Sequence, residues 1–128
     1  MQTTETNQKE VHRGEIYFYS FPKQEGSVQF GLRPCVVVSN EKNNELSTIV
    51  NVIPLTTQPK NPLPTHVYIN VGSVYGNALA EQIMTIPKSR LRQYCGEIDS
   101  QTQKKSTTLL LYSFLLICKL PVRTKKRT

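Results

Sequence analysis

The chain has 128 residues, which is enough for one domain with a single hydrophobic core. Apolar residues make up 38% and charged residues 20%, as in an ordinary globular protein. The formal net charge is +7, but the last ten residues hold five Lys or Arg and no acid, so 7 − 5 leaves +2 for residues 1–118. The body of the protein is therefore nearly neutral, and charge alone does not identify a nucleic-acid-binding protein.

Membrane insertion and secretion are not expected. The longest apolar stretch, residues 109–118, is about half the length that a membrane-spanning helix needs. Residues 1–10 are polar and contain no hydrophobic signal region. Cys35, Cys95 and Cys118 have no metal-ligand spacing, which is typical of reduced, structural thiols. We expect a cytoplasmic protein that uses no metal or other cofactor.

The first part of the chain reads as two strands joined by a long loop. Residues 1–11 carry no apolar pattern and are expected to be disordered. Glu15 to Phe21 is rich in aromatic and β-branched residues, which predicts a strand. After a polar loop over residues 23–31, the continuous apolar run from Cys35 to Ser39 predicts a second strand that is buried on both faces.

The rest of the chain predicts further short strands and two helices. The expected strands are 48–53, 65–70, 78–86 and 95–98, with a turn or short helical segment at 40–45, a turn at 71–77, a short helix at 88–94 and a last helix at 101–117. This pattern indicates a mainly β (α+β) protein, a small antiparallel β-barrel with helices outside it. Apolar residues lie on most faces of the last helix, which favours its burial against a partner surface.

Arg33 stands at the beginning of the second strand. Pro34 suits the first residue of a strand, because it fixes φ and lacks an N–H, and it also favours an extended Arg33. Gly31 allows the preceding loop to approach a ligand closely. The sequence thus predicts a guanidinium held at a rigid rim, and a guanidinium suits phosphate binding.

Three sets of polar residues at or within apolar strands are candidates for chemistry: Arg33, Thr56 and the pair Glu81-Gln82. They form neither a metal-ligand cluster nor a nucleophile with a base and an orienting acid. They do suit phosphodiester chemistry in which the 2′-hydroxyl of RNA is the nucleophile and the protein stabilises the charge on phosphorus. Structural explanations stay open: a surface Arg33, turn hydrogen bonds from Thr56 and Thr57, a structural His66, and an ion pair of Glu81 with Arg90 or Arg92.

Five segments in order over residues 12–117 resemble the MazF/PemK toxins of bacterial toxin–antitoxin systems: 13–17, 26–34, 54–58, 63–67 and 81–83. The resemblance implies an SH3-like β-barrel, a homodimer to whose packing the last helix contributes, and a cognate antitoxin that occupies the RNA groove. It also implies metal-independent cleavage of single-stranded RNA (mRNA), leaving a 2′,3′-cyclic phosphate and a 5′-hydroxyl. The expected domain spans residues 12–118, and residues 119–128 form a basic tail.

The same resemblance assigns roles to individual residues. Arg33 matches the catalytic arginine of the family and Thr56 its catalytic hydroxyl residue. The expected RNA-binding residues are Gln29, Gly31, Thr57, Glu81 and Gln82.

Two departures from the family pattern keep other functions open. Many members have Glu in place of Val28 and a basic residue in place of Met84. A catalytically weak RNA-binding member is therefore one alternative. The other is a non-enzymatic toxin like the CcdB proteins that poison DNA gyrase, although this chain lacks Trp and ends in a basic tail.

Overall fold

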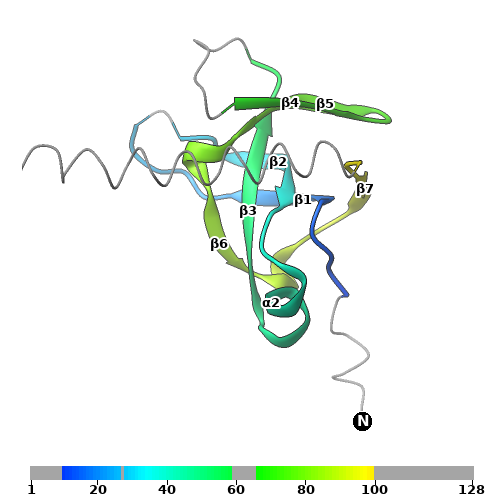
Figure 1. The fold of residues 1–128 in the computed structure, drawn as a ribbon. Helices are drawn as coiled ribbons and strands as arrows, with labels where there is room; N and C mark the ends of the chain where they lie inside the picture. Colours follow the sequence, from blue (N-terminus) through cyan, green and yellow to red (C-terminus); the bar gives the residue numbers. More distant parts are fainter. Residues whose placement is uncertain (1–9, 27, 59–65, 100–128) are drawn as a thin grey trace, which may run out of the picture.

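The computed structural model describes residues 10–26, 28–58 and 66–99, which form a curled, antiparallel half-barrel of seven strands (Figure 1). The strands are β1 (Glu15–Phe21), β2 (Gly31–Val37), β3 (Ile49–Thr56), β4 (His66–Val71), β5 (Val74–Leu79), β6 (Met84–Pro87) and β7 (Tyr94–Glu97). The helical segments are α2 (Glu41–Leu46) and the 3-10 turns η1 (Ala80–Gln82) and η2 (Lys88–Arg90). The helix predicted over 101–117 and the tail 119–128 lie outside the described residues. Within the described ranges, no helix is long and apolar enough to cross a membrane.

Strand β3 is the centre of the architecture. The strand order is β4-β5-β3-β2-β1-β7, and β6 also pairs with β3. β3 runs from α2 at one end of the molecule to the β4–β5 hairpin at the other (Figure 1). Residues 49–52 of β3 pair with β6, residues 52–54 pair with β2, and residues 55–56 pair with β5. This arrangement confirms the predicted small antiparallel β-barrel class.

The sheet is covered on both faces, as the apolar run in β2 predicts. Alternate residues of a strand point to opposite faces, so Cys35 and Val37 join one core cluster and Val36 joins the other. All three side chains are at most 1% exposed. Val11, in the segment expected to be disordered, is 3% exposed and packs in the cluster that contains Cys35.

Two prolines lie inside strands that were expected to begin or end at them. β2 begins at Gly31, so Pro34 is its fourth residue, and β3 continues through Pro54 to Thr56. Pro34 faces Phe18, whose N–H and C=O bond instead to the segment before β7, so no β1 group needs an N–H from Pro34. Pairing of β2 with β3 begins only at Cys35. The missing N–H is therefore tolerated.

The region after residue 70 differs most from the prediction. The expected turn over 71–77 contains most of β5, and the actual turn is at Gly72 and Ser73. The expected strand over 78–86 is interrupted by η1, so Glu81 and Gln82 lie on a 3-10 turn. The expected helix over 88–94 is only η2, and β7 begins one residue earlier than predicted. Thus β5 is an additional strand.

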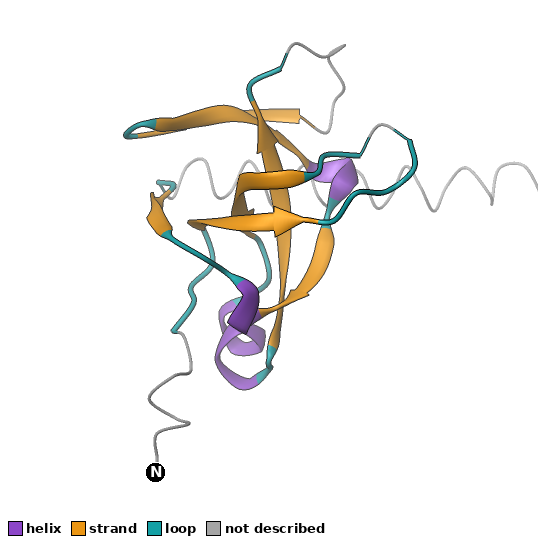
Figure 2. Ribbon diagram, turned by 180° about the vertical axis from the view of Figure 1, so that it is seen from behind, coloured by secondary structure: helices purple, strands orange, loops and turns teal. Residues whose placement is uncertain are grey.

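A buried lysine joins η2 to α2. These two helical segments lie next to each other at one end of the molecule (Figure 2). Lys88 is 5% exposed, and its Nζ donates a hydrogen bond of 2.6 Å to the carbonyl oxygen of Asn44. This carbonyl is among the last four of α2, which have no partner within the helix. The backbone N–H of Lys88 also donates to Thr48. Lys88 therefore satisfies the end of α2 and fixes the start of the segment that leads to β7.

Candidate functional site at the rim of the half-barrel

Arg33 and Thr56 belong to the same face of the sheet. Cys35 pairs with Pro54, and Arg33 and Thr56 each lie two residues beyond this pair, toward the same end of the two antiparallel strands. Arg33 also pairs directly with Tyr19 of β1. Because alternate side chains share a face, these residues continue the face that carries Cys35 and Val52. Next to this core, the face carries the guanidinium of Arg33, the hydroxyl of Thr56 and the ring of Tyr19.

The hydroxyl of Thr56 is held by the backbone around it. Thr56 is the last residue of β3 and is 2% exposed. Its Oγ1 accepts a hydrogen bond of 3.1 Å from the N–H of Gln58, so the turn bond foreseen as the structural alternative is present. Gly76 packs against Thr56 on the β5 side with φ +149°, and a Cβ there would lie 2.7 Å from the Thr56 carbonyl oxygen. Only glycine permits this approach.

The side chain of Arg33 is tied to the loop before its own strand. Its Nε donates a hydrogen bond of 2.7 Å to the carbonyl oxygen of Phe30. This bond uses Nε and not the two terminal amino groups. Phe30 and Leu32, which both precede Arg33 in the chain, are 47% and 59% exposed. The guanidinium is thus anchored at one atom beside exposed apolar side chains.

Two predicted RNA-binding residues meet across the rim. Oε1 of Gln82 accepts a hydrogen bond of 2.9 Å from the backbone N–H of Gln29, which joins η1 to the loop that precedes β2. Gln29 is 7% exposed, and its Oε1 is a buried oxygen with no hydrogen-bond partner among the described residues. An unpaired buried amide oxygen is costly, so it is a candidate acceptor for a ligand donor. We name Arg33, Thr56, Gln29 and Gln82 the Arg33 rim.

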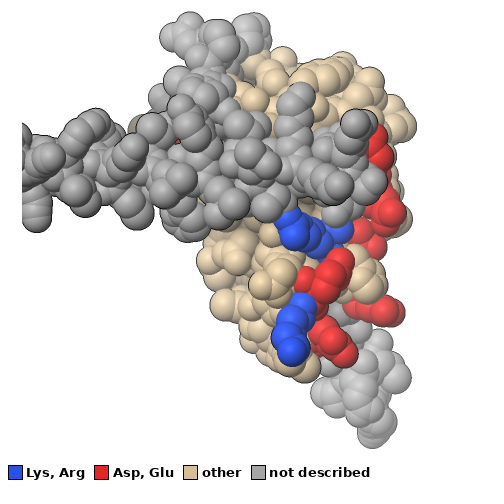
Figure 3. All heavy atoms as spheres, in the orientation of Figure 1, with Lys and Arg blue, Asp and Glu red and all other residues tan. Residues whose placement is uncertain are grey.

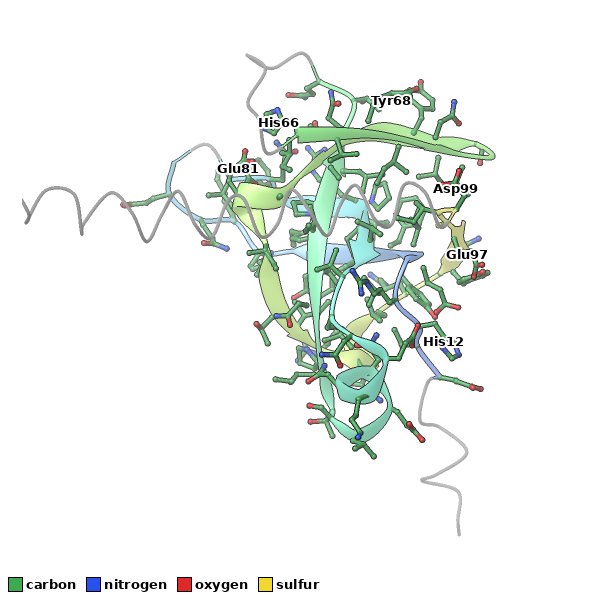
Figure 4. All side chains as sticks on the ribbon, in the orientation of Figure 1. His12, His66, Tyr68, Glu81, Glu97 and Asp99 are labelled. Atoms are coloured by element: carbon green, nitrogen blue, oxygen red, sulfur yellow. The ribbon has the colours of Figure 1, made fainter. Side chains whose placement is uncertain are left out.

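Glu81 does not pair with Arg90 or Arg92 in the way considered from the sequence. Its Oε2 lies 3.0 Å from Nε2 of His66 at the start of β4 (Figure 4). The His66 side chain is 9% exposed and that of Glu81 32% exposed. The pair connects the β4–β5 hairpin to η1. The apolar periodicity of the sequence did not indicate this contact, because η1 interrupts the strand that was expected over residues 78–86.

The remaining predicted site residues stand beside the rim. Gly31 is the first residue of β2 with φ +86°, a conformation that glycine adopts without strain. Thr57 is exposed and follows Thr56 directly. The residue that the sequence reasoning missed is Tyr19. Its alternation within β1 was visible, but its position opposite Arg33 required the strand register.

The described part of the chain is not basic as a whole. It contains seven Lys or Arg and eight Asp or Glu, so 7 − 8 gives −1. Acidic and basic side chains lie side by side around β7 and α2, and the β4–β5 hairpin contains no Lys, Arg, Asp or Glu (Figure 3). Burial raises the pKa of the Cys35 thiol to about 12, so this cysteine is neutral and unsuited to nucleophilic chemistry.

Comparison with known sequences identifies the family. The sequence profile of the PemK-like, MazF-like toxins of type II toxin–antitoxin systems matches residues 12–114. The chain belongs to this family. It is similar to endoribonuclease EndoA of Bacillus subtilis, at 37% identity over 113 residues that cover 84% of this chain and 97% of that protein. Endoribonuclease MazF of Staphylococcus saprophyticus is 31% identical over 100 residues, or 74% of this chain and 83% of that protein.

Solved structures of MazF-type proteins have the same fold. A mycobacterial endoribonuclease in complex with its cognate antitoxin aligns with a TM-score of 0.67 and 28% identity, over 81% of this chain and 94% of that one. MazF from Deinococcus radiodurans aligns with a TM-score of 0.68 at 23% identity, which supports the fold alone. Met84, one of the two departures from the MazF pattern, packs against the core cluster that contains Cys35.

Proposed function

We propose that this MazF-family chain is an endoribonuclease toxin that cleaves single-stranded RNA, with mRNA as its target, without a metal ion. The observation that supports the proposal is that Arg33 and Thr56 lie on the same face of the sheet, each two residues beyond the Cys35–Pro54 pair. The endoribonuclease names of the two relatives at 37% and 31% identity support the same activity. None of the roles that we propose for the residues of the Arg33 rim requires a cofactor.

In the proposed reaction the RNA supplies its own nucleophile. The 2′-oxygen forms a bond to the adjacent phosphorus, the bond from phosphorus to the 5′-oxygen breaks, and a 2′,3′-cyclic phosphate forms. The proton lost from the 2′-hydroxyl is balanced by the proton gained by the leaving 5′-oxygen. Arg33 neutralises the charge that develops on the phosphoryl oxygens, and the Thr56 hydroxyl donates a hydrogen bond to one of them. Because Thr56 is 2% exposed, the groups that cover it must move when RNA binds.

The residues around the pair bind and orient the RNA in this proposal. Gln29 presents its unpaired Oε1 to a base or a 2′-hydroxyl. Gly31 and Thr57 border the phosphate, and Glu81 and Gln82 fix η1 against the loop before β2. Among the residues assigned to RNA, Glu81 supplies a single carboxylate, and this carboxylate is already in contact with His66. These residues are therefore poor ligands for Mg²⁺. We therefore assign the chemistry to the side chains and the substrate.

We further propose that the chain acts as a homodimer and is inhibited by a cognate antitoxin. The mycobacterial endoribonuclease of the same fold was solved in complex with its cognate antitoxin, which supports this class of partner. The functional domain proposed for the chain spans residues 12–118, and residues 119–128 are proposed to be a separate basic tail.

The proposal is tested by incubating the protein with a long single-stranded RNA in EDTA and mapping the new 5′ ends. We expect discrete cuts whose 5′ ends carry hydroxyl groups, and no cuts in the same sequence annealed to its complement. Cleavage only after Mg²⁺ is restored would contradict the mechanism. RNA that binds but is not cut would identify the catalytically weak member, and absence of both binding and cutting would favour the gyrase-poisoning alternative.

A further inference from the structure

A pocket of about 430 Å³ opens beside β1, on the side away from β2. The described residues that line it are Tyr19, Ser20, Ser89, Arg90, Leu91 and Arg92, and we name it the Arg90 pocket. It combines two guanidinium groups, two serine hydroxyls and the ring and hydroxyl of a tyrosine. None of these six residues is acidic.

The two arginines of the pocket are available to a ligand. Both are exposed, and neither forms a salt bridge with an acid within the described ranges, where the ion pairs join His12 or His66 to glutamates. They are two of only seven Lys or Arg in a described region whose net charge is −1. Such local pairing of guanidiniums with hydroxyl donors suits a phosphate group.

The backbone around the pocket is fixed. The N–H of Arg92 donates a hydrogen bond of 2.7 Å to the carbonyl oxygen of Phe18, and the N–H of Phe18 donates one of 3.0 Å to Gln93. On the other side, Lys88 holds the start of η2 against α2. The segment from Ser89 to Arg92 is therefore anchored at both ends, and the fold holds the backbone of this pocket wall in place.

The Arg90 pocket continues the surface of the Arg33 rim. Tyr19 forms one wall of the pocket and is the direct cross-strand partner of Arg33. Arg33, Tyr19 and Arg92 thus lie on three neighbouring chain segments, and two interstrand spacings put the Arg92 backbone about 10 Å from that of Arg33. This separation suits the binding of two different parts of one RNA strand at the rim and at the pocket.

We propose that the Arg90 pocket binds a backbone phosphate of the RNA at a position remote from the phosphate that Arg33 and Thr56 attack. Arg90 and Arg92 bind the phosphate oxygens, Ser20 and Ser89 donate hydrogen bonds, and the Tyr19 ring offers a stacking surface to the attached base. This inference rests on the proposed function and adds a binding subsite to it. The subsite contributes affinity for RNA and takes no part in the chemical step.

The test compares the parent protein with the double variant Arg90→Ala/Arg92→Ala. Binding of a long single-stranded RNA is measured over a range of salt concentrations, and kcat is measured at saturating RNA. The variant is expected to raise Kd about tenfold or more and to lower the slope of log affinity against log salt by about 1.4, for two lost contacts to single-stranded RNA. Its kcat stays at the parent value.

Two matched variants make the result specific. Lys42→Ala removes an exposed charge on α2 and is expected to bind RNA like the parent, whereas Arg90→Lys/Arg92→Lys is expected to recover most of the salt slope. Unchanged Kd and slope in the double alanine variant would overturn the subsite while leaving the proposed function intact. A collapse of kcat at unchanged Kd would also overturn it. Failure of the parent protein to bind or cut RNA would instead refute the proposed function and the subsite together.

Discussion

Replacement of Arg33 by alanine is expected to lower cleavage of single-stranded RNA by about 10³-fold or more, because a preorganised charge at the phosphoryl oxygens is lost. The side chain is partly exposed and its hydrogen bond to the Phe30 carbonyl lies at the surface, so the fold is expected to survive the change. The measurement is kcat/KM on an RNA with one cut site, with thermal unfolding recorded on the same sample.

Arg33→Lys separates charge from geometry. Lysine retains the positive charge but lacks the planar fork and the Nε–H that bonds to Phe30, so we expect activity between those of the parent and Arg33→Ala. Arg13→Ala serves as the matched control, since Arg13 precedes β1 next to α2 and its backbone N–H bonds to Glu41. Parental cleavage by Arg33→Ala would show that the catalytic role is assigned to the wrong residue.

Replacement of Thr56 by valine is expected to lower kcat about 10²- to 10³-fold, the effect of removing one hydrogen-bond donor from a developing oxyanion. Valine has nearly the same shape, so the change deletes the hydroxyl and leaves the buried packing in place. It also leaves the Gln58 N–H without its acceptor, which should cost about 0.5–1.5 kcal/mol of stability. Single-turnover cleavage and urea unfolding measure the two effects separately.

Thr56→Ser decides between the catalytic and the structural role of this hydroxyl. Serine keeps the donor and the acceptor, so most of the activity should return even if the loss of a buried methyl group lowers stability. A valine variant that cuts RNA at the parental rate would show that the hydroxyl serves only the turn at Gln58.

The strands were predictable where apolar patterning dominated. The first strand, Glu15–Phe21, has the expected bounds, and the unbroken run after Pro34 correctly indicated burial on both faces. Proline was over-weighted as a strand boundary, because a missing N–H is harmless wherever the neighbouring strand does not use it. Gly76 appeared to mark a turn, yet its role inside β5 is to let that strand approach Thr56 closely.

The candidate site was predictable as a set of residues but not as an arrangement. The family resemblance selected Arg33 and Thr56, and the pairing of Cys35 with Pro54 shows that they share a face of the sheet. The contacts of His66 with Glu81 and of Gln29 with Gln82 join segments distant in the chain through a 3-10 turn. Such contacts depend on tertiary packing, for which a single sequence carries no periodic signal.

The central claim is that the RNA itself provides the attacking oxygen, and a single 2′-deoxy substitution tests it most directly. Once the cut site is mapped, an otherwise identical RNA is made with deoxyribose on the 5′ side of the scissile phosphate. The account predicts that the protein binds this RNA but does not cut it at that bond, while a 2′-deoxy group one nucleotide further away leaves the cut in place. Cleavage at the substituted position would contradict the account, because the nucleophile would then have to come from water or the protein.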